Sequence, residues 1–177
     1  MEENKPKFIF TCQRCGRCCE REIKIYLNDI ERWSKDGSIN QVFPHLKVSG
    51  ESMAFSLSLE IDDGKCRMYD PTSKECKIYN NRPQVCRAYP LMHDGNGFLL
   101  RDNECPGLNK GEMTKDALAE IRKAAVEENK DERRTAAILP MLQAILLGEM
   151  ARRSEEAYSK LSEDEKAKLE EILKNRE

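Results

Sequence analysis

The 177-residue sequence has little histidine, no long apolar run and almost no net charge. Its 30 basic and 32 acidic side chains give a formal net charge of −2, so we expect no nucleic-acid partner, because binding through phosphate neutralisation needs a basic surface. The most apolar stretch, 136–150, contains Pro140, Gln143 and Glu149 and is shorter than the roughly 20 residues that cross a bilayer. We therefore expect no membrane span. The N-terminus also lacks the apolar segment of a secretory signal, which makes the cytoplasm the expected location.

Cysteine, by contrast, is abundant, with eight residues that all lie between Cys12 and Cys105. Cytoplasmic thiols are kept reduced, which favours metal or cluster binding over the two alternatives, disulfides and inert thiols. The two histidines, His45 and His93, are solitary and are better explained as surface or hydrogen-bonded residues than as ligands. Their scarcity disfavours zinc sites of the Cys2His2 type.

The composition divides the chain into two unlike parts. Residues 1–111 hold all the cysteines and most of the glycine and proline, whereas residues 112–177 are rich in Ala, Glu, Lys, Leu and Arg, which are good helix formers. We therefore predict a small, loop-rich α+β domain, stabilised by a metal or cluster, in residues 1–111. Residues 112–177 are predicted to form an all-helical C-terminal extension, which packs on the cysteine domain or serves as an arm for a protein partner.

Local patterns predict short elements in the first part. Residues 8–10, 23–27 and 54–59 are expected to form strands, the last two because apolar and polar residues alternate. Asn28 is a candidate N-cap of a short helix that ends near Asp36–Gly37. Residues 62–64 and 94–97 are turn clusters. Residues 62–103 contain no long periodic element, and a metal ion held by this stretch could stabilise it.

Three helical signals follow in the second part. Thr114 can cap a helix that has Leu118, Ile121 and Ala125 on one face. A second helical run starts at Asp131, with Pro140 predicted to kink or break it. Residues 162–165, Ser-Glu-Asp-Glu, fit a capping box for a last helix.

The strongest motif is the run of residues 12–19, Cys-Gln-Arg-Cys-Gly-Arg-Cys-Cys. Two-residue gaps let a tight turn aim thiolates at one centre, and the spacing resembles the Cys-x2-Cys-x2-Cys run around cubane clusters. Neighbouring side chains of an extended backbone point to opposite faces, so Cys18 and Cys19 could serve different sites. We assign Cys12, Cys15 and Cys18 to one centre with a distant fourth cysteine.

Four further cysteines are candidate ligands, and their pairing stays open because sequence does not fix connectivity: Cys66, Cys76, Cys86 and Cys105. Arg82 and Arg87 flank Cys86, where they could offset cluster charge and donate hydrogen bonds to sulfur, and solvated surface arginines are the alternative. Zinc and iron–sulfur clusters both accept four thiolates, so the eight cysteines suffice for one or two sites of either kind.

The combined motifs resemble the YkgJ-type cysteine-cluster family, a CxxCxxCC zinc- or iron-chelating domain. The resemblance rests on residues 12–19, on Cys66-Arg-Met-Tyr-Asp, on Cys76-Lys-Ile-Tyr, and on the run Arg-Pro-x-x-Cys-Arg-x-Tyr-Pro at 82–90, and it covers about residues 10–106. It implies a small cytosolic metal or iron–sulfur protein. A related cysteine domain occurs in the much longer flagellin lysine methylases.

Three functions are compatible with these observations. The favoured one is an iron–sulfur protein, most simply with one or two [4Fe-4S] clusters, that transfers electrons or serves as an accessory subunit of a redox complex. The second is a structural zinc protein that docks to a partner. The third is an iron–sulfur enzyme related to protein lysine methylation, although no nucleophile–base pair, phosphate-binding loop or dinucleotide fingerprint is present.

Overall fold

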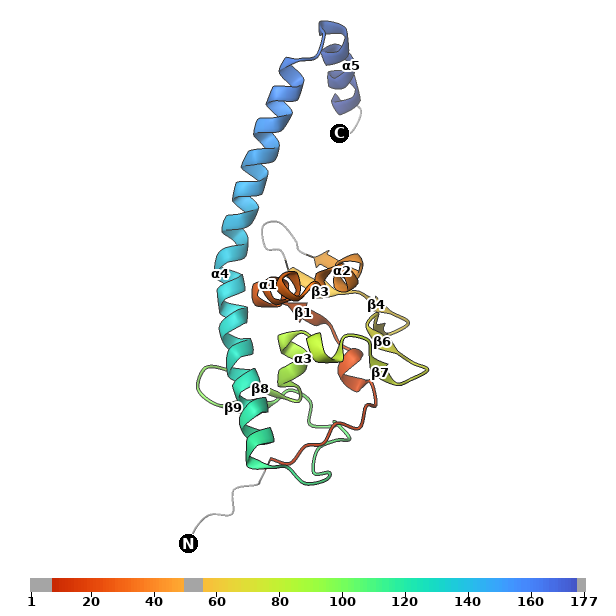
Figure 1. The fold of residues 1–177 in the computed structure, drawn as a ribbon. Helices are drawn as coiled ribbons and strands as arrows, with labels where there is room; N and C mark the ends of the chain where they lie inside the picture. Colours follow the sequence, from red (N-terminus) through yellow and green to blue (C-terminus); the bar gives the residue numbers. More distant parts are fainter. Residues whose placement is uncertain (1–7, 50–55, 175–177) are drawn as a thin grey trace. The chain divides into compact units, whose positions relative to one another are not determined.

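The computed structural model describes residues 8–49 and 56–174 (Figure 1). The chain divides into two compact units, Met1–Ala137 and Ile138–Glu177, and the division falls inside the long helix α4 (Lys115–Ser159). The first unit thus extends past residue 111, where the composition changes. Short antiparallel strands and helices are present together with the long helix near the C-terminus, which confirms the predicted α+β class with a helical extension.

A three-stranded antiparallel sheet with the order β1-β3-β2 carries the first hydrophobic core. It consists of β1 (Ile23–Ile25), β2 (Leu46–Ser49) and β3 (Ser56–Leu59). Ile23 and Ile25 are buried whereas Lys24 is exposed, which confirms the alternation seen in the sequence. Ile23 and Leu46 both pair with Leu59, which is buried as well. The predicted start of the third strand, at residues 54 and 55, lies outside the described residues.

The helix predicted after β1 is present as α1 (Leu27–Asp36), and it ends at Gly37 in the left-handed conformation with a φ of 80°. Asn28 is not its cap. The helix begins at Leu27, and its cap is Tyr26, two residues before Asn28; the backbone N–H of Tyr26 donates to Asp29 Oδ2 at 3.2 Å. The Asn28 side chain contacts Asp131 of α4 instead. A tertiary contact has therefore replaced the local capping role that the sequence predicted.

After α1 the chain runs through α2 (Ile39–Val42) and the 3-10 turn η2 (Phe43–His45) back to the sheet. Trp33 of α1 and Val42 of α2 are completely buried against the sheet. The Trp33 indole N–H donates to the backbone oxygen of Asn81 at 2.6 Å, which attaches α1 to a segment far along the chain.

Residues 61–100 form a series of very short elements, as expected for a stretch without long periodicity. Three antiparallel strand pairs are β4 (Ile61–Asp62) with β5 (Lys65–Cys66), β6 (Tyr69–Asp70) with β7 (Glu75–Cys76), and β8 (Leu91–His93) with β9 (Phe98–Leu100). Between them lie η3 (Tyr79–Asn81) and the short helix α3 (Gln84–Ala88). The strand predicted at 8–10 is reduced to a single antiparallel bridge between Phe10 and Leu108.

The first part of α4 packs on this unit through the face that the sequence predicted. The Thr114 hydroxyl accepts from the N–H of Ala117 at 3.1 Å, which confirms the cap. Ile121 and Ala125 are buried with Ala88 and Leu91 in a second hydrophobic cluster. Apolar burial therefore holds the cysteine-bearing segments and the start of α4 together in one unit.

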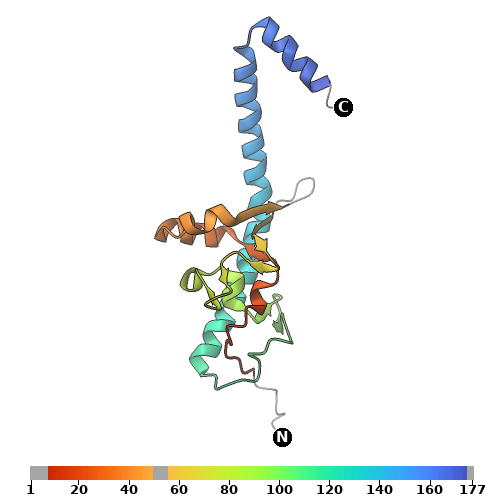
Figure 2. The ribbon, with the colours of Figure 1, turned by 90° about the vertical axis from the view of Figure 1, so that its right-hand side faces the viewer.

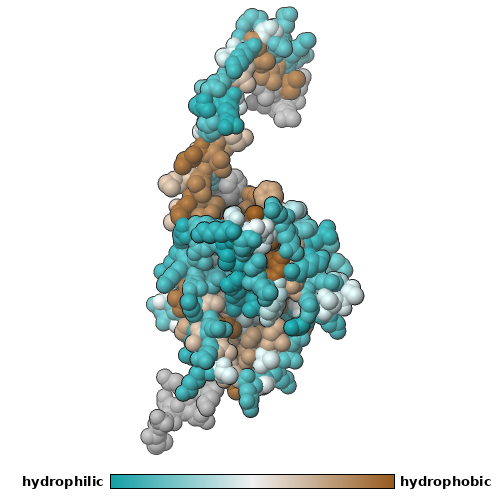
Figure 3. Space-filling model, viewed as in Figure 1, coloured by the Kyte–Doolittle hydropathy of each residue, from teal (hydrophilic) through white to brown (hydrophobic). Residues whose placement is uncertain are grey.

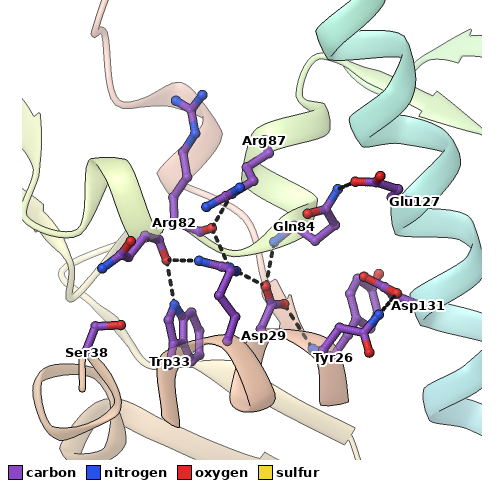
Figure 4. Close-up of polar contacts among 12 residues, drawn as sticks. Tyr26, Asp29, Trp33, Ser38, Arg82, Gln84, Arg87, Glu127 and Asp131 are labelled. Carbon is purple, nitrogen blue, oxygen red and sulfur yellow. Dashed lines mark hydrogen bonds and ion pairs between the residues drawn. The ribbon is translucent and has the colours of Figure 1, made fainter. Parts of the chain in front are cut away.

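A buried carboxylate joins α1 to α3 (Figure 4). Asp29 Oδ1 accepts from the backbone N–H of Gln84 at 2.9 Å and from the Arg32 guanidinium at 2.8 Å. The Gln84 amide in turn donates to the backbone oxygen of Ala124 in α4 at 2.9 Å. The network fixes the start of α3, the helix that carries Cys86.

The second unit contains the rest of α4 and helix α5 (Glu163–Lys174). The capping box predicted for α5 is confirmed, since Ser162 N–H donates to Glu165 Oε2 at 2.9 Å and Glu165 N–H donates to Ser162 Oγ at 3.4 Å. A kink or a break was predicted at Pro140; the break is wrong, because α4 continues through this residue as one helix. Pro140 and Ala136 are both exposed, so water can reach the carbonyl that proline leaves without a helical partner.

Candidate metal centre

Five cysteines converge in the first unit from four separate segments of the chain. Cys18 and Cys19 belong to the 3-10 turn η1 (Arg17–Cys19), Cys66 and Cys76 end the strands β5 and β7, and Cys86 lies in α3. In two views η1 lies beside α3 (Figures 1 and 2). Cys66 belongs to the hydrophobic core, and Cys19, Cys76 and Cys86 pack against that core. We refer to these five residues as the five-thiol group.

The adjacent pair of cysteines does not point to opposite faces. Because η1 is a 3-10 turn rather than extended backbone, the sulfur atoms of Cys18 and Cys19 approach to 3.9 Å. Gly16 precedes the turn with a left-handed φ of 76°, and a Cβ at this position would lie 2.7 Å from the Tyr69 ring. Glycine is therefore required both for the backbone conformation and for the close approach of the ring.

The charge of Cys18 reaches the other members of the group. The negative charge of an ionised Cys18 raises the pKa of Cys66, Cys76 and Cys86. Loss of solvation on burial raises the pKa of each of these three thiols more than the charge of Cys18 does. The pKa of Cys66 rises to about 11, and those of Cys76 and Cys86 also rise, because burial disfavours the thiolate.

Cys18 behaves in the opposite way. Its pKa falls to about 7, chiefly because it accepts a hydrogen bond from the Cys19 thiol, with further help from the positive charge of Arg21. The same hydrogen bond raises the pKa of Cys19. Within the five-thiol group Cys18 is thus the thiol that ionises most readily, and a positive charge such as that of a bound metal ion would favour deprotonation of its neighbours.

A cavity of about 280 Å³ lies beside the five-thiol group. Its lining combines thiols with two tyrosine rings, charged side chains, an amide and a glycine: Cys12, Arg14, Gly16, Cys18, Cys19, Tyr69, Lys74, Glu75, Cys76, Tyr79 and Asn80. Because a water molecule takes about 30 Å³ in the liquid, the cavity has room for a group much larger than one ion.

The other three cysteines are placed differently. Cys12 is exposed at the cavity, Cys15 is exposed, and Cys105 is buried with its thiol beside the Tyr89 hydroxyl. Within residues 8–49 and 56–174, no group of three or more Cys, His, Asp or Glu side chains is placed so that it could hold a metal ion. The five-thiol group fits a metal or cluster in its donor chemistry, and binding would require the sulfurs to move closer together.

Of the two arginines predicted to support the site, Arg82 contributes its charge. It lowers the pKa of Cys18 and opposes the rise at Cys76, while its guanidinium lies 4.2 Å from the centre of the Tyr79 ring. Arg87 donates to the backbone oxygens of Arg82 and Asn80, at 3.1 and 3.0 Å. The geometry of Arg87 is that of a residue that holds the chain around Cys86.

Sequence reasoning missed Arg21. Its guanidinium lies within electrostatic reach of Cys18 and Cys86, and it is held over the Tyr89 ring at 5.1 Å. Apart from Cys18, the partners of Arg21 are more than 60 positions away, so the local sequence does not mark this residue. The only available signal was its place two residues after the cysteine run.

Buried and half-buried thiols from several segments, with cations nearby, are typical of a cysteine-rich metal-binding domain. A family model described as "CxxCxxCC: putative zinc- or iron-chelating domain" matches residues 11–106, and the chain belongs to this family. This confirms the resemblance seen in the sequence and supports metal binding as the general property of the domain. No curated protein and no solved structure matches the chain. Among the helices of the described residues, none combines the length and apolar character that crossing a membrane needs.

Proposed function

We propose that the five-thiol group holds an iron–sulfur cluster, most simply one [4Fe-4S] cluster, and that the protein acts in electron transfer. The observation that carries this proposal is the convergence of five cysteines from four segments beside a cavity of about 280 Å³. Four thiolates complete such a cluster, so four of the five would bind and the fifth would stay a neighbour.

When bound, such a cluster supplies reversible one-electron chemistry. The residues of the chain bury the sulfurs and surround them with cations. Arg21 and Arg82 favour the charged form of Cys18, and the hydrophobic core around Cys66 limits access of water. Both effects set the potential at which an electron enters an iron–sulfur site.

Structural zinc is a second candidate, favoured by one distance. With Zn–S bonds of about 2.3 Å, two ligands of a tetrahedral zinc ion lie about 3.8 Å apart. The sulfurs of Cys18 and Cys19 are separated by 3.9 Å. This pair could therefore bind one ion with little movement, whereas the size of the cavity favours the cluster.

We further propose that the protein serves a protein partner, such as a redox complex, through the apolar residues of the second unit. Between 38% and 63% of each of these side chains is exposed (Figure 3): Met141, Leu142, Ile145, Leu146, Leu147 and Met150. Exposed apolar surface of this extent is typical of interaction sites. Replacing Ile145 by Glu should weaken association with such a partner and leave metal content unchanged.

The direct test of the proposed cluster is analysis of protein purified without oxygen. We expect iron and acid-labile sulfide in equal amounts, broad visible absorption, and an electron paramagnetic resonance signal in one redox state. A colourless protein with stoichiometric zinc and no sulfide would overturn the iron–sulfur proposal in favour of structural zinc.

A further inference from the structure

Arg21 carries a buried hydrogen-bond donor that nothing satisfies. Its Nε atom has no accessible surface and no partner among the residues that the structure describes. Leaving a charged donor unpaired in this way costs free energy, so a partner that the protein acquires at this position would be strongly favoured.

The rest of the guanidinium is fixed by the segment around Cys86. One NH2 group donates to the backbone oxygen of Val85 at 3.4 Å, and the group lies 5.1 Å from the centre of the Tyr89 ring. Val85 and Tyr89 flank Cys86 on either side along the chain. Arg21 is therefore held over the part of α3 that presents this thiol.

Within the part of the chain that the structure describes, Arg21 forms no ion pair. Glu128 lies within electrostatic reach of Arg21; its Oε1 accepts from Arg101 at 2.5 Å, and its Oε2 is buried without a hydrogen-bond partner. The remaining negative groups that can face Arg21 are the thiolates of Cys18 and Cys86. Arg17, by contrast, is paired with carboxylates at 2.7 and 2.5 Å.

We propose that Arg21 is a positioning residue of the metal centre, whose partly buried guanidinium offsets the charge of the Cys18 and Cys86 thiolates when the five-thiol group binds its metal or cluster. This inference rests on the proposed function, and it adds a residue outside the cysteine motifs identified in the sequence. The proposed role is electrostatic and can be distinguished from packing by experiment. Lysine would replace the positive charge of Arg21 but not its stacking on Tyr89.

The test compares Arg21→Met with Arg21→Lys in the full chain purified without oxygen, with iron content and midpoint potential as readouts. Removing the positive charge should make reduction of the cluster at least tenfold less favourable, a shift of about 59 mV to lower potential for one electron. Arg21→Lys should keep a potential close to that of the wild type. The matched control is Arg67→Met, since Arg67 follows Cys66 directly but is paired with Asp62 at 2.7 Å.

An Arg21→Met variant with full iron content and the wild-type potential would overturn the proposal. A lysine variant that shifts as far as the methionine variant would do the same, because it would assign the effect to shape. If the methionine variant loses its cluster, the lysine variant decides: wild-type iron content and potential support the proposal, and a similar loss contradicts it.

The proposed function can fail separately from this inference. A wild-type protein that holds zinc refutes the iron–sulfur proposal, and competition with a zinc chelator then replaces the redox titration. Arg21→Met should lower zinc affinity at least tenfold, with rescue by lysine. Equal affinities in wild type and Arg21→Met would refute the role of Arg21.

Discussion

Replacing Asp29 by alanine should destabilise the first unit by about 3–5 kcal/mol. The carboxylate accepts three hydrogen bonds, from Tyr26 N–H at 3.2 Å, Gln84 N–H at 2.9 Å and Arg32 at 2.8 Å. Hydrogen bonds to a charged group contribute about 1.5–3 kcal/mol each, and the cost of burying the carboxylate offsets part of their sum. Arg32 keeps its bonds to two backbone oxygens, which limits the loss further.

The assay is urea unfolding followed by circular dichroism, with metal content matched between variants because a bound metal adds its own stability. Asp29→Asn is the control for shape. It keeps the size and one acceptor oxygen, and should lose less than the alanine variant. A loss below about 1 kcal/mol in Asp29→Ala would refute the reasoning, since it would mean that the start of α3 does not depend on this carboxylate.

Further predictions concern pH, a glycine and two cysteines. Burial raises the pKa of Asp29 in the folded protein. The wild type should therefore gain stability relative to Asp29→Asn as the pH falls from 7 towards about 4, and lose that gain as the pH rises again. A stability difference between the two proteins that does not change with pH would contradict the raised pKa. Gly107→Ala should cost about 1–3 kcal/mol, because its Cβ would lie 2.4 Å from the backbone oxygen of Thr11, whereas Gly97→Ala, with nothing within 4 Å, should unfold like wild type. Cys86→Ser should remove most of the bound metal and the exposed Cys15→Ser should retain it, as measured by elemental analysis; equal loss in both would place Cys15 in the centre.

Local patterns predicted the local elements. The alternation around Lys24 gave a strand, and Thr114 and Ser162 capped the helices that follow them. Each of these signals depends only on residues a few positions apart. A prediction from local sequence was wrong where a residue has a distant partner: Asn28 contacts Asp131 instead of capping α1.

The candidate site shows the same limit. The cysteine motifs identified the family and the donor chemistry, but not which sulfurs meet. The fold brings Cys18 and Cys86 near each other because η1 packs near α3. The spacing of cysteines along the chain does not show which of them become neighbours. Arg21 was missed for the same reason, because its position over Cys86 depends on residues that are distant in the sequence.

X-ray absorption at the edge of the bound metal tests the central claim most directly. The proposed centre predicts a first shell of sulfur alone, with an additional iron–iron contribution if the group is a cluster. A shell of nitrogen and oxygen, or anaerobically purified protein without bound iron or zinc, would contradict the assignment of the five-thiol group as a metal centre.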